Sequence, residues 1–266
     1  MAKEKVVALI YDFDKTLAIS DMQNFKFIQN LGLEIGEFWE KTNQFSIEHH
    51  CEKILAYLYV MMEECKNRNI PLTEDYLKSL GSYVVYYEGV LSWFDRINQY
   101  GKDRGVKIEH YIISSGNKEI IEGTRIADKF KHIFACSYVY DNNGIAIWPK
   151  NIINYTSKTQ CLFRISKGVL DIREDNKVNE KIGIKHVEFN NMIYIGDGVT
   201  DVPCMTLIKE RNGLSVAVYK SGKPEVANEL VLADRVDLSV TADYREGTKL
   251  DRVVKAKIDL VSLTEE

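Results

Sequence analysis

Short, continuous apolar runs that end in polar or glycine residues constrain the fold of this chain most. Four such runs are present, the last being the weakest, at residues 6–11, 110–113, 191–195 and 214–219. Continuous apolar runs of this length are typical of strands buried on both faces of a parallel sheet. Helical spacing fills segments between them, at residues 92–100, 118–130 and 159–165. Strands that alternate with helices predict an α/β fold with a doubly wound, Rossmann-like parallel sheet.

Polar and acidic side chains follow three of these runs directly. Asp12 and Asp14 follow the first run, Ser114 follows the second, and Asp197 follows the third. We expect them to converge, because ligands bind beyond the carboxyl ends of the strands in such sheets. Neighbouring carboxylates repel each other unless a cation or a shared proton relieves them. A site with only oxygen ligands is typical of Mg²⁺.

Residues 21–88 have a different pattern from the rest of the chain. Their apolar residues follow helical spacing, as in Ile54, Leu58 and Met61, and only residues 83–87 are a doubtful strand. The pattern predicts a mostly α-helical cap domain inserted after the first strand, with hinges near Ser20 and Gly89. The predicted core domain then consists of residues 1–20 and 89–266.

The remaining segments carry weaker signals. An Asn-Gly turn at 143–144 between two alternating runs predicts a β-hairpin over residues 137–148. Residues 171–185 are charged and irregular, which indicates an exposed loop with a short helix. The tail predicts a last strand at 236–240 and a helix at 249–261.

Composition excludes several classes of protein. The chain has 266 residues, 45% of them hydrophobic and 28% charged, which is an ordinary globular balance rather than that of a disordered or fibrous chain. Its net charge of −4 disfavours dense binding of nucleic acid. We find neither a secretory signal peptide nor an apolar stretch of about 18 residues that would span a membrane. Five cysteines without a CxxC pair predict reduced thiols and a cytoplasmic location.

The motifs at the strand ends resemble those of the haloacid dehalogenase (HAD) superfamily. The motif DFDKTL begins at Asp12, Ser114 follows the second strand, and GDGVTD ends at Asp201. Their order and strand contexts match the superfamily, and are most similar to its phosphoserine-phosphatase-like branch. The helical insertion stands where the superfamily carries its first type of cap.

This resemblance implies a phosphatase that uses Mg²⁺ and an aspartyl-phosphate intermediate. Asp12 would be the nucleophile, and Asp14 would be the general acid and then the general base. Mg²⁺ would be held by Asp12, Asp197 and the backbone carbonyl of Asp14. Asp201 would orient the groups around the metal or the catalytic lysine.

The resemblance also implies a phosphate-binding set and a catalytic lysine. Ser114, Ser115 and Thr16 would contact or support the phosphoryl group, together with backbone N–H groups. The lysine should lie at the start of a helix between the hairpin and the last acidic motif. Lys158 fits this position best, and Lys167 is the alternative.

The expected substrate is a small phosphorylated metabolite, with no nucleic-acid or membrane partner, and the oligomeric state stays open. Two other functions remain: a phosphotransferase or phosphomutase that uses the same intermediate, and a catalytically silent protein that binds a phosphate ligand. Candidate residues for substrate selection are those near the first hinge or bulky in the cap: Ser20, Asp21, Met22, Phe25, Phe38 and Trp39.

Overall fold

The computed structural model describes residues 4–181, 183 and 185–264. Its seven-stranded sheet has the order β4-β3-β2-β1-β5-β6-β7. The strands are β1 Lys5–Tyr11, β2 Val106–Asn117, β3 His132–Tyr140, β4 Ala146–Asn151, β5 Met192–Gly196, β6 Leu214–Tyr219 and β7 Leu238–Thr241. All neighbouring pairs are parallel except β3 and β4, which form the predicted antiparallel hairpin. The predicted α/β fold with a Rossmann-like sheet is confirmed.

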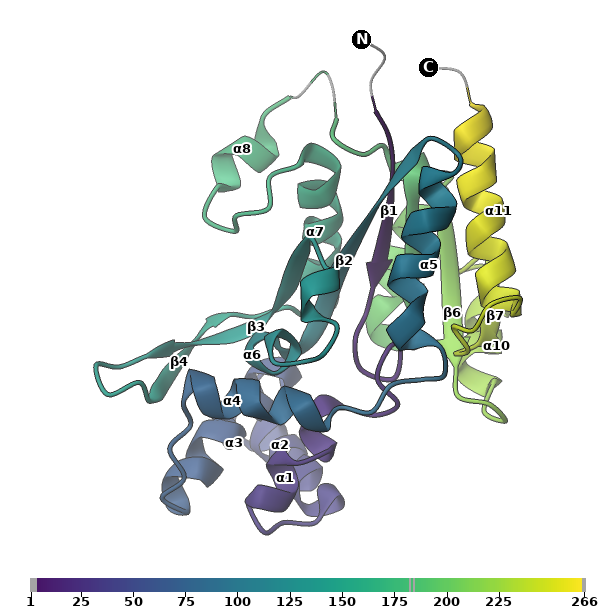
Figure 1. Cartoon of the computed structure of the whole chain (residues 1–266). Coiled ribbons are helices and arrows are strands. Elements are labelled where there is room, and N and C mark those ends of the chain that lie inside the picture. The colour runs from purple at the N-terminus through teal and green to yellow at the C-terminus, as the bar shows by residue number, and fades with distance from the viewer. Residues whose placement is uncertain (1–3, 182, 184, 265–266) are drawn as a thin grey trace.

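The helices cover both faces and one end of this sheet (Figure 1). They are α1 Phe27–Asn30, α2 Ile35–Glu48, α3 Lys53–Asn67, α4 Glu74–Leu80, α5 Val90–Lys102, α6 Lys118–Glu122, α7 Tyr155–Lys167, α8 Asp175–Asn179, α9 Val202–Glu210, α10 Glu225–Leu232 and α11 Lys249–Leu263. Helices α5 and α11 pack together against β1 and β2, while α7 packs on α9, which covers β5 and β6. Right-handed crossovers place these two helix pairs on opposite faces of the sheet.

Strand β1 lies at the centre of the sheet and sets the position of the site. From Val7 to Tyr11 its residues are completely buried, as its continuous apolar run predicts. Tyr11 pairs with Ile112 of β2 on one side and with Ile195 of β5 on the other. The residues that follow these three strands therefore meet at one edge of the sheet.

A helical segment, residues 21–88, lies beyond this edge and contains α1 to α4 (Figure 1). The two connections between it and the sheet run side by side. Ile19 donates its N–H to the carbonyl of Val85 and Tyr87 donates to Leu17, each at 3.0 Å, and Ala18 forms an isolated bridge with Tyr86. The doubtful strand at 83–87 is thus one half of this short contact. The division into two domains stays a prediction.

The predicted helix at 118–130 is wrong in length. Helix α6 ends at Glu122, and a single 3-10 turn follows at Ala127–Lys129. The helix stops at Gly123, which packs against the backbone of α4: a Cβ added there would clash with the Lys78 carbonyl. Packing of the helical segment on α6 therefore overrides the local helical pattern.

Other predicted elements are present with shifted ends. Helix α7 extends past the expected 159–165 because the Asn154 side chain caps its first turn and Gly168, at φ 70°, ends it. In the irregular segment 171–185, of which residues 182 and 184 lie outside the described residues, α8 is the short helix. The last strand and last helix occupy Leu238–Thr241 and Lys249–Leu263.

Candidate active site

Asp12 occupies the position that follows the central strand. Its N–H donates to the Ile195 carbonyl at 2.9 Å, which continues the pairing of β1 with β5. Its Oδ1 accepts a hydrogen bond from the Phe13 N–H at 2.8 Å and lies 3.2 Å from the Lys158 Nζ. In the part of the chain that the structure describes, the second oxygen, Oδ2, accepts no hydrogen bond. The carboxylate is thus held by one oxygen and offers the other.

Lys158, rather than Lys167, lies among the carboxylates. Its side chain is completely buried, and its Nζ donates to Asp201 Oδ1 at 2.7 Å besides contacting Asp12. Burial lowers the pKa of Lys158, but the carboxylates of Asp12 and Asp201 outweigh this effect and raise it above the usual value. Lys167 donates instead to the backbone carbonyls of Val178 and Glu180. The start of α7 therefore supplies the buried cation of the site.

Asp201 is oriented by neighbours on two sides. Its Oδ1 accepts from Lys158 and also from the Tyr194 hydroxyl at 2.6 Å. Its Oδ2 lies where a side chain on Gly196 would be, since a Cβ added there would lie 2.5 Å from that oxygen. The glycine that ends β5 thus leaves room for this carboxylate. Asp201 therefore contacts the same ammonium group of Lys158 as Asp12 does.

Three carboxylates gather at this point. Asp12, Asp197 and Asp201 each offer an oxygen that lies within 4.8 Å of the other two. Burial raises the pKa of Asp12 to about 6, although the charge of Lys158 lowers it. Burial, followed by the charges of Asp201 and Asp12, raises the pKa of Asp197 well above its usual value. Carboxylates crowded in this way are stabilised by a cation. The donor set consists of hard oxygens and fits Mg²⁺.

The side chain of Asp14 lies outside this group of three. Its Oδ1 accepts a hydrogen bond from the Met22 N–H at 2.8 Å, and the residue lines the cavity described below. Burial, together with the charges of Asp21 and Asp12, raises the pKa of Asp14 well above its usual value. A carboxyl group in this setting retains its proton more readily than an exposed one, which suits a proton donor.

Of the three predicted phosphate-binding residues, Ser114 and Ser115 line the cavity and Thr16 does not. The Ser114 Oγ accepts from the Gly116 N–H at 3.0 Å. The Ser115 Oγ is buried and has no hydrogen-bond partner among the described residues. Thr16 is completely buried, and its carbonyl accepts from the Tyr244 hydroxyl at 2.9 Å. The structure therefore brings Thr16 next to the loop of Asp14 but not to the cavity surface.

A cavity of about 390 Å³ opens over these residues, between the sheet edge and the helical segment. Asp12, Asp14 and Asp197 line it. Asp21 and Trp39, among the predicted selection residues, line it; Ser20, Met22, Phe25 and Phe38 do not. Further lining residues, which the motifs do not predict, come from the helical segment and from α7: Gln23, Thr42, Asn43, Lys53, Ile54, Tyr57 and Tyr155.

The spacing of these residues along their helices is a signal from which they could have been predicted. Thr42 and Asn43 follow the predicted Trp39 by three and four positions on α2, and Lys53 and Tyr57 lie four positions apart on α3. Residues three or four apart share a face of a helix. The spacing alone does not say which face covers the site, because the helices also have apolar faces that form their own core.

Comparisons with known proteins agree with this architecture. No protein-family model matches the chain. A protein of Borreliella burgdorferi, described as uncharacterized, is 28% identical over 291 aligned positions, which cover 97% of this chain and 98% of the relative.

Several solved structures have the same fold. A substrate-bound complex of phosphoserine phosphatase matches with a TM-score of 0.59 at 15% identity, over 96% of this chain and 99% of that one. A HAD family hydrolase from Salmonella enterica serovar Typhi matches with a TM-score of 0.56 at 15% identity, over 89% and 67%. A probable phosphoserine phosphatase from Vibrio cholerae matches with a TM-score of 0.59 at 13% identity, over 97% and 66%. The chain thus has the fold of HAD hydrolases in the form found in phosphoserine phosphatases, and the resemblance predicted from the motifs is confirmed at the level of the fold.

Proposed function

We propose that this protein is a Mg²⁺-dependent phosphatase that hydrolyses a small phosphorylated metabolite through an aspartyl-phosphate intermediate. One observation carries the proposal: the Asp12 carboxylate is held by Phe13 and Lys158 through Oδ1 and lines a cavity that Asp14 and Asp197 also line. A buried nucleophile, a proton donor and a cation around one open space are what phosphoryl transfer requires.

In the first step, Asp12 Oδ2 attacks phosphorus, because Oδ1 is already engaged with Phe13 and Lys158. The bond between phosphorus and the leaving oxygen breaks, and the carboxyl proton of Asp14 passes to that oxygen. In the second step, Asp14 as a carboxylate takes a proton from a water molecule, which attacks phosphorus and releases Asp12 and inorganic phosphate. The Lys158 ammonium stays close to the negative charge that builds up in both steps.

Mg²⁺ fits the residues present. Asp12 and Asp197 would hold it, with the backbone carbonyl of Asp14, while Asp201 keeps Lys158 oriented. When bound, the metal ion would neutralise charge on the phosphoryl group. The closeness of the Asp12 and Asp197 oxygens supports this assignment, because carboxylates this near to each other repel unless a cation relieves them.

The substrate is expected to be small, since the cavity of about 390 Å³ lies between the sheet and the helical segment. In the described part of the chain, none of the helices has the length and apolar character needed to cross a membrane. The five cysteines are free thiols, four of them buried. The cytoplasmic location predicted from them stays a prediction.

Phosphate release from a broad panel of phosphorylated metabolites tests the proposal. Each compound is assayed with Mg²⁺ and with EDTA, and Asp12→Asn serves as the blank. We expect release that needs Mg²⁺ and is absent from the variant. A folded protein that binds Mg²⁺ but releases no phosphate from any compound would contradict the proposal. It would favour the phosphotransferase, which needs an acceptor other than water, or the silent binding protein.

A further inference from the structure

The loop between β7 and α11 contacts both connections between the sheet and the helical segment. Tyr244 on this loop is completely buried. Its N–H donates to the Glu88 carbonyl at 2.8 Å, on the returning connection. Its hydroxyl donates to the Thr16 carbonyl at 2.9 Å, on the outgoing connection. One residue near the carboxyl end of the chain thus joins the two segments at their bases.

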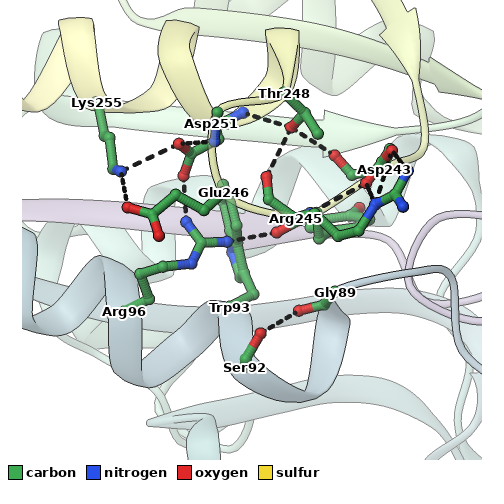
Figure 2. Close-up of polar contacts among 12 residues, drawn as sticks. Gly89, Ser92, Trp93, Arg96, Asp243, Arg245, Glu246, Thr248, Asp251 and Lys255 are labelled. Atoms are coloured by element: carbon green, nitrogen blue, oxygen red, sulfur yellow. Dashed lines mark hydrogen bonds and ion pairs between the residues drawn. The ribbon is translucent and has the colours of Figure 1, made fainter.

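This loop is held by the core rather than by the helical segment. Figure 2 shows Arg96 of α5 reaching both the loop and Asp251 of α11. Arg96 donates to the Tyr244 carbonyl, and the Trp93 ring packs edge-on against the Tyr244 ring with 5.3 Å between centroids. The Thr248 hydroxyl donates to the Asp243 carbonyl at 2.9 Å. The position of Tyr244 is therefore set by α5 and α11.

Gly89 shows how closely the returning connection lies on the same loop. Its φ is 84°, a conformation that favours glycine. A Cβ added to Gly89 would also clash with the backbone of Tyr244 and Arg245. The contact between the loop and this connection consequently leaves no room for a side chain.

The outgoing connection is the loop that carries Asp14. The N–H groups of Thr16, Leu17 and Ala18 all point to the Phe13 carbonyl, at 3.3, 3.0 and 3.0 Å, so the loop forms one compact turn. The Tyr244 hydroxyl holds this turn from the core side through Thr16. On the other side, the Met22 N–H holds the Asp14 carboxyl group. Asp14 therefore lies between one contact from the core and one from the helical segment.

We propose that the Tyr244 hydroxyl is a positioning residue that holds the turn carrying Asp14, so that Asp14 can deliver its proton to the leaving oxygen. This inference rests on the proposed phosphatase function. Without the hydroxyl, the turn loses its contact with the core at Thr16 and follows the helical segment instead. Proton transfer from Asp14 to the leaving oxygen is then slowed. Attack by Asp12 is not slowed, because Phe13 and Lys158 still hold its carboxylate.

The test compares two substrates in wild-type protein and in Tyr244→Phe. One is an alkyl phosphate, whose leaving oxygen needs a proton, and the other is p-nitrophenyl phosphate, whose leaving group departs without one. We expect kcat/KM to fall roughly 10-fold or more for the alkyl phosphate and less than about 2-fold for p-nitrophenyl phosphate. Partial unfolding cannot produce this result, because it lowers both rates by the same factor.

Tyr138→Phe is the matched control, since Tyr138 is also completely buried and its hydroxyl donates to a backbone carbonyl, that of Leu58, at 2.9 Å. It should leave the ratio of the two rates unchanged. In an Asp14→Asn background, Tyr244→Phe should cause no further loss with the alkyl phosphate. Equal losses on both substrates, no loss, or an additive loss in that background would overturn the inference.

If Tyr244→Phe does not fold, Arg96→Lys loosens the loop that positions the Tyr244 hydroxyl, because Arg96 donates to the Tyr244 carbonyl. The same selective loss is expected, and equal losses on both substrates are the contrary result. Wild-type protein that hydrolyses neither substrate nor any metabolite of the panel would instead count against the proposed function.

Discussion

The Asp12 carboxylate has one oxygen engaged in polar contacts and one that accepts no hydrogen bond from the described residues. The engaged oxygen, Oδ1, accepts a hydrogen bond from the Phe13 N–H at 2.8 Å and lies 3.2 Å from the Lys158 Nζ. Lys158 is in turn held by Asp201, which also accepts from the Tyr194 hydroxyl. A chain of buried polar contacts from β5 to β1 therefore holds the carboxylate of the proposed nucleophile.

Replacing Lys158 tests this arrangement. We expect Lys158→Ala to lower kcat/KM for the best substrate by at least about 10²-fold, because a buried cation beside the transferring phosphoryl group is lost. Lys167→Ala is the control and should keep activity near that of the wild-type protein, since the hydrogen bonds of Lys167 among the described residues go to backbone carbonyls of the α8 region. The reverse order of the two effects in steady-state assays would show that the lysine is wrongly assigned.

Some residues of the site can be predicted from the sequence and others cannot. Asp12, Asp14, Ser114 and Asp197 could be found because each lies within three positions of the end of an apolar run, and parallel register brings such positions together. Thr16 could not be placed, because its distance from the cavity depends on the turn of residues 13–18 and on Tyr244. Lys53 and Tyr57 could not be chosen either, since only packing decides which face of α3 covers the site.

At the scale of elements, β2 is tied to its neighbours by a buried carboxylate near its start. The Glu109 side chain is 3% exposed and accepts from Lys131 at 2.7 Å and from the Tyr111 hydroxyl at 2.6 Å. His186, on the segment that leads to β5, lies 2.7 Å from it. Burial raises the pKa of Glu109, but these hydrogen bonds outweigh it and lower the pKa to about 2. Glu109 therefore joins three segments that are distant in sequence.

This contact predicts how stability depends on pH. The pKa of Glu109 is lower in the folded protein than its usual value of 4.5, so its contribution to stability is present above about pH 4.5 and is lost as the pH falls toward 2. We expect Glu109→Gln to lower the free energy of unfolding at neutral pH by on the order of 2 kcal/mol, with a difference that shrinks below pH 4.5. Denaturant unfolding across this range measures it.

Glu63→Gln, which changes an exposed carboxylate of α3, serves as the control and should have little effect at any pH. A difference between Glu109→Gln and wild-type protein that stayed constant from neutral pH down to pH 2 would rule out this account of Glu109.

Element order and type could be predicted more fully than element length. The central strands carry runs that are buried on both faces, so their identity follows from the sequence alone. Helix α6 ends early because Gly123 packs on the backbone of α4, a contact between residues more than forty positions apart. Residues 83–87 resemble a strand, yet their partner is the short outgoing connection at 17–19. Both differences arise from tertiary contacts that local patterns do not contain.

At the scale of the whole molecule, the cavity joins the sheet and the helical segment around a group of buried carboxylates. These carboxylates repel one another in the folded chain, and a bound cation relieves the repulsion. We therefore expect Mg²⁺ to raise the melting temperature, with a stabilisation of about 2.7 kcal/mol at a concentration of 100 times Kd. Differential scanning calorimetry with Mg²⁺ and with EDTA measures this effect without any substrate.

Asp197→Asn should abolish most of the Mg²⁺-dependent shift. Asp128→Asn, which changes an exposed carboxylate outside the cavity lining, should retain it. An undiminished shift in Asp197→Asn would place the metal ion elsewhere in the protein.

The central claim is that Asp12 receives the phosphoryl group, and a single-turnover reaction quenched in acid tests it most directly. Excess protein is mixed with the best substrate and Mg²⁺, quenched, and digested after Lys and Arg, so that residues 6–15 form one peptide with both Asp12 and Asp14. We predict that mass spectrometry finds one phosphoryl group on this peptide, with fragment ions that assign it to Asp12, and none in Asp12→Asn. Phosphate release by wild-type protein with no phosphoryl group on Asp12 at any quench time would contradict the account.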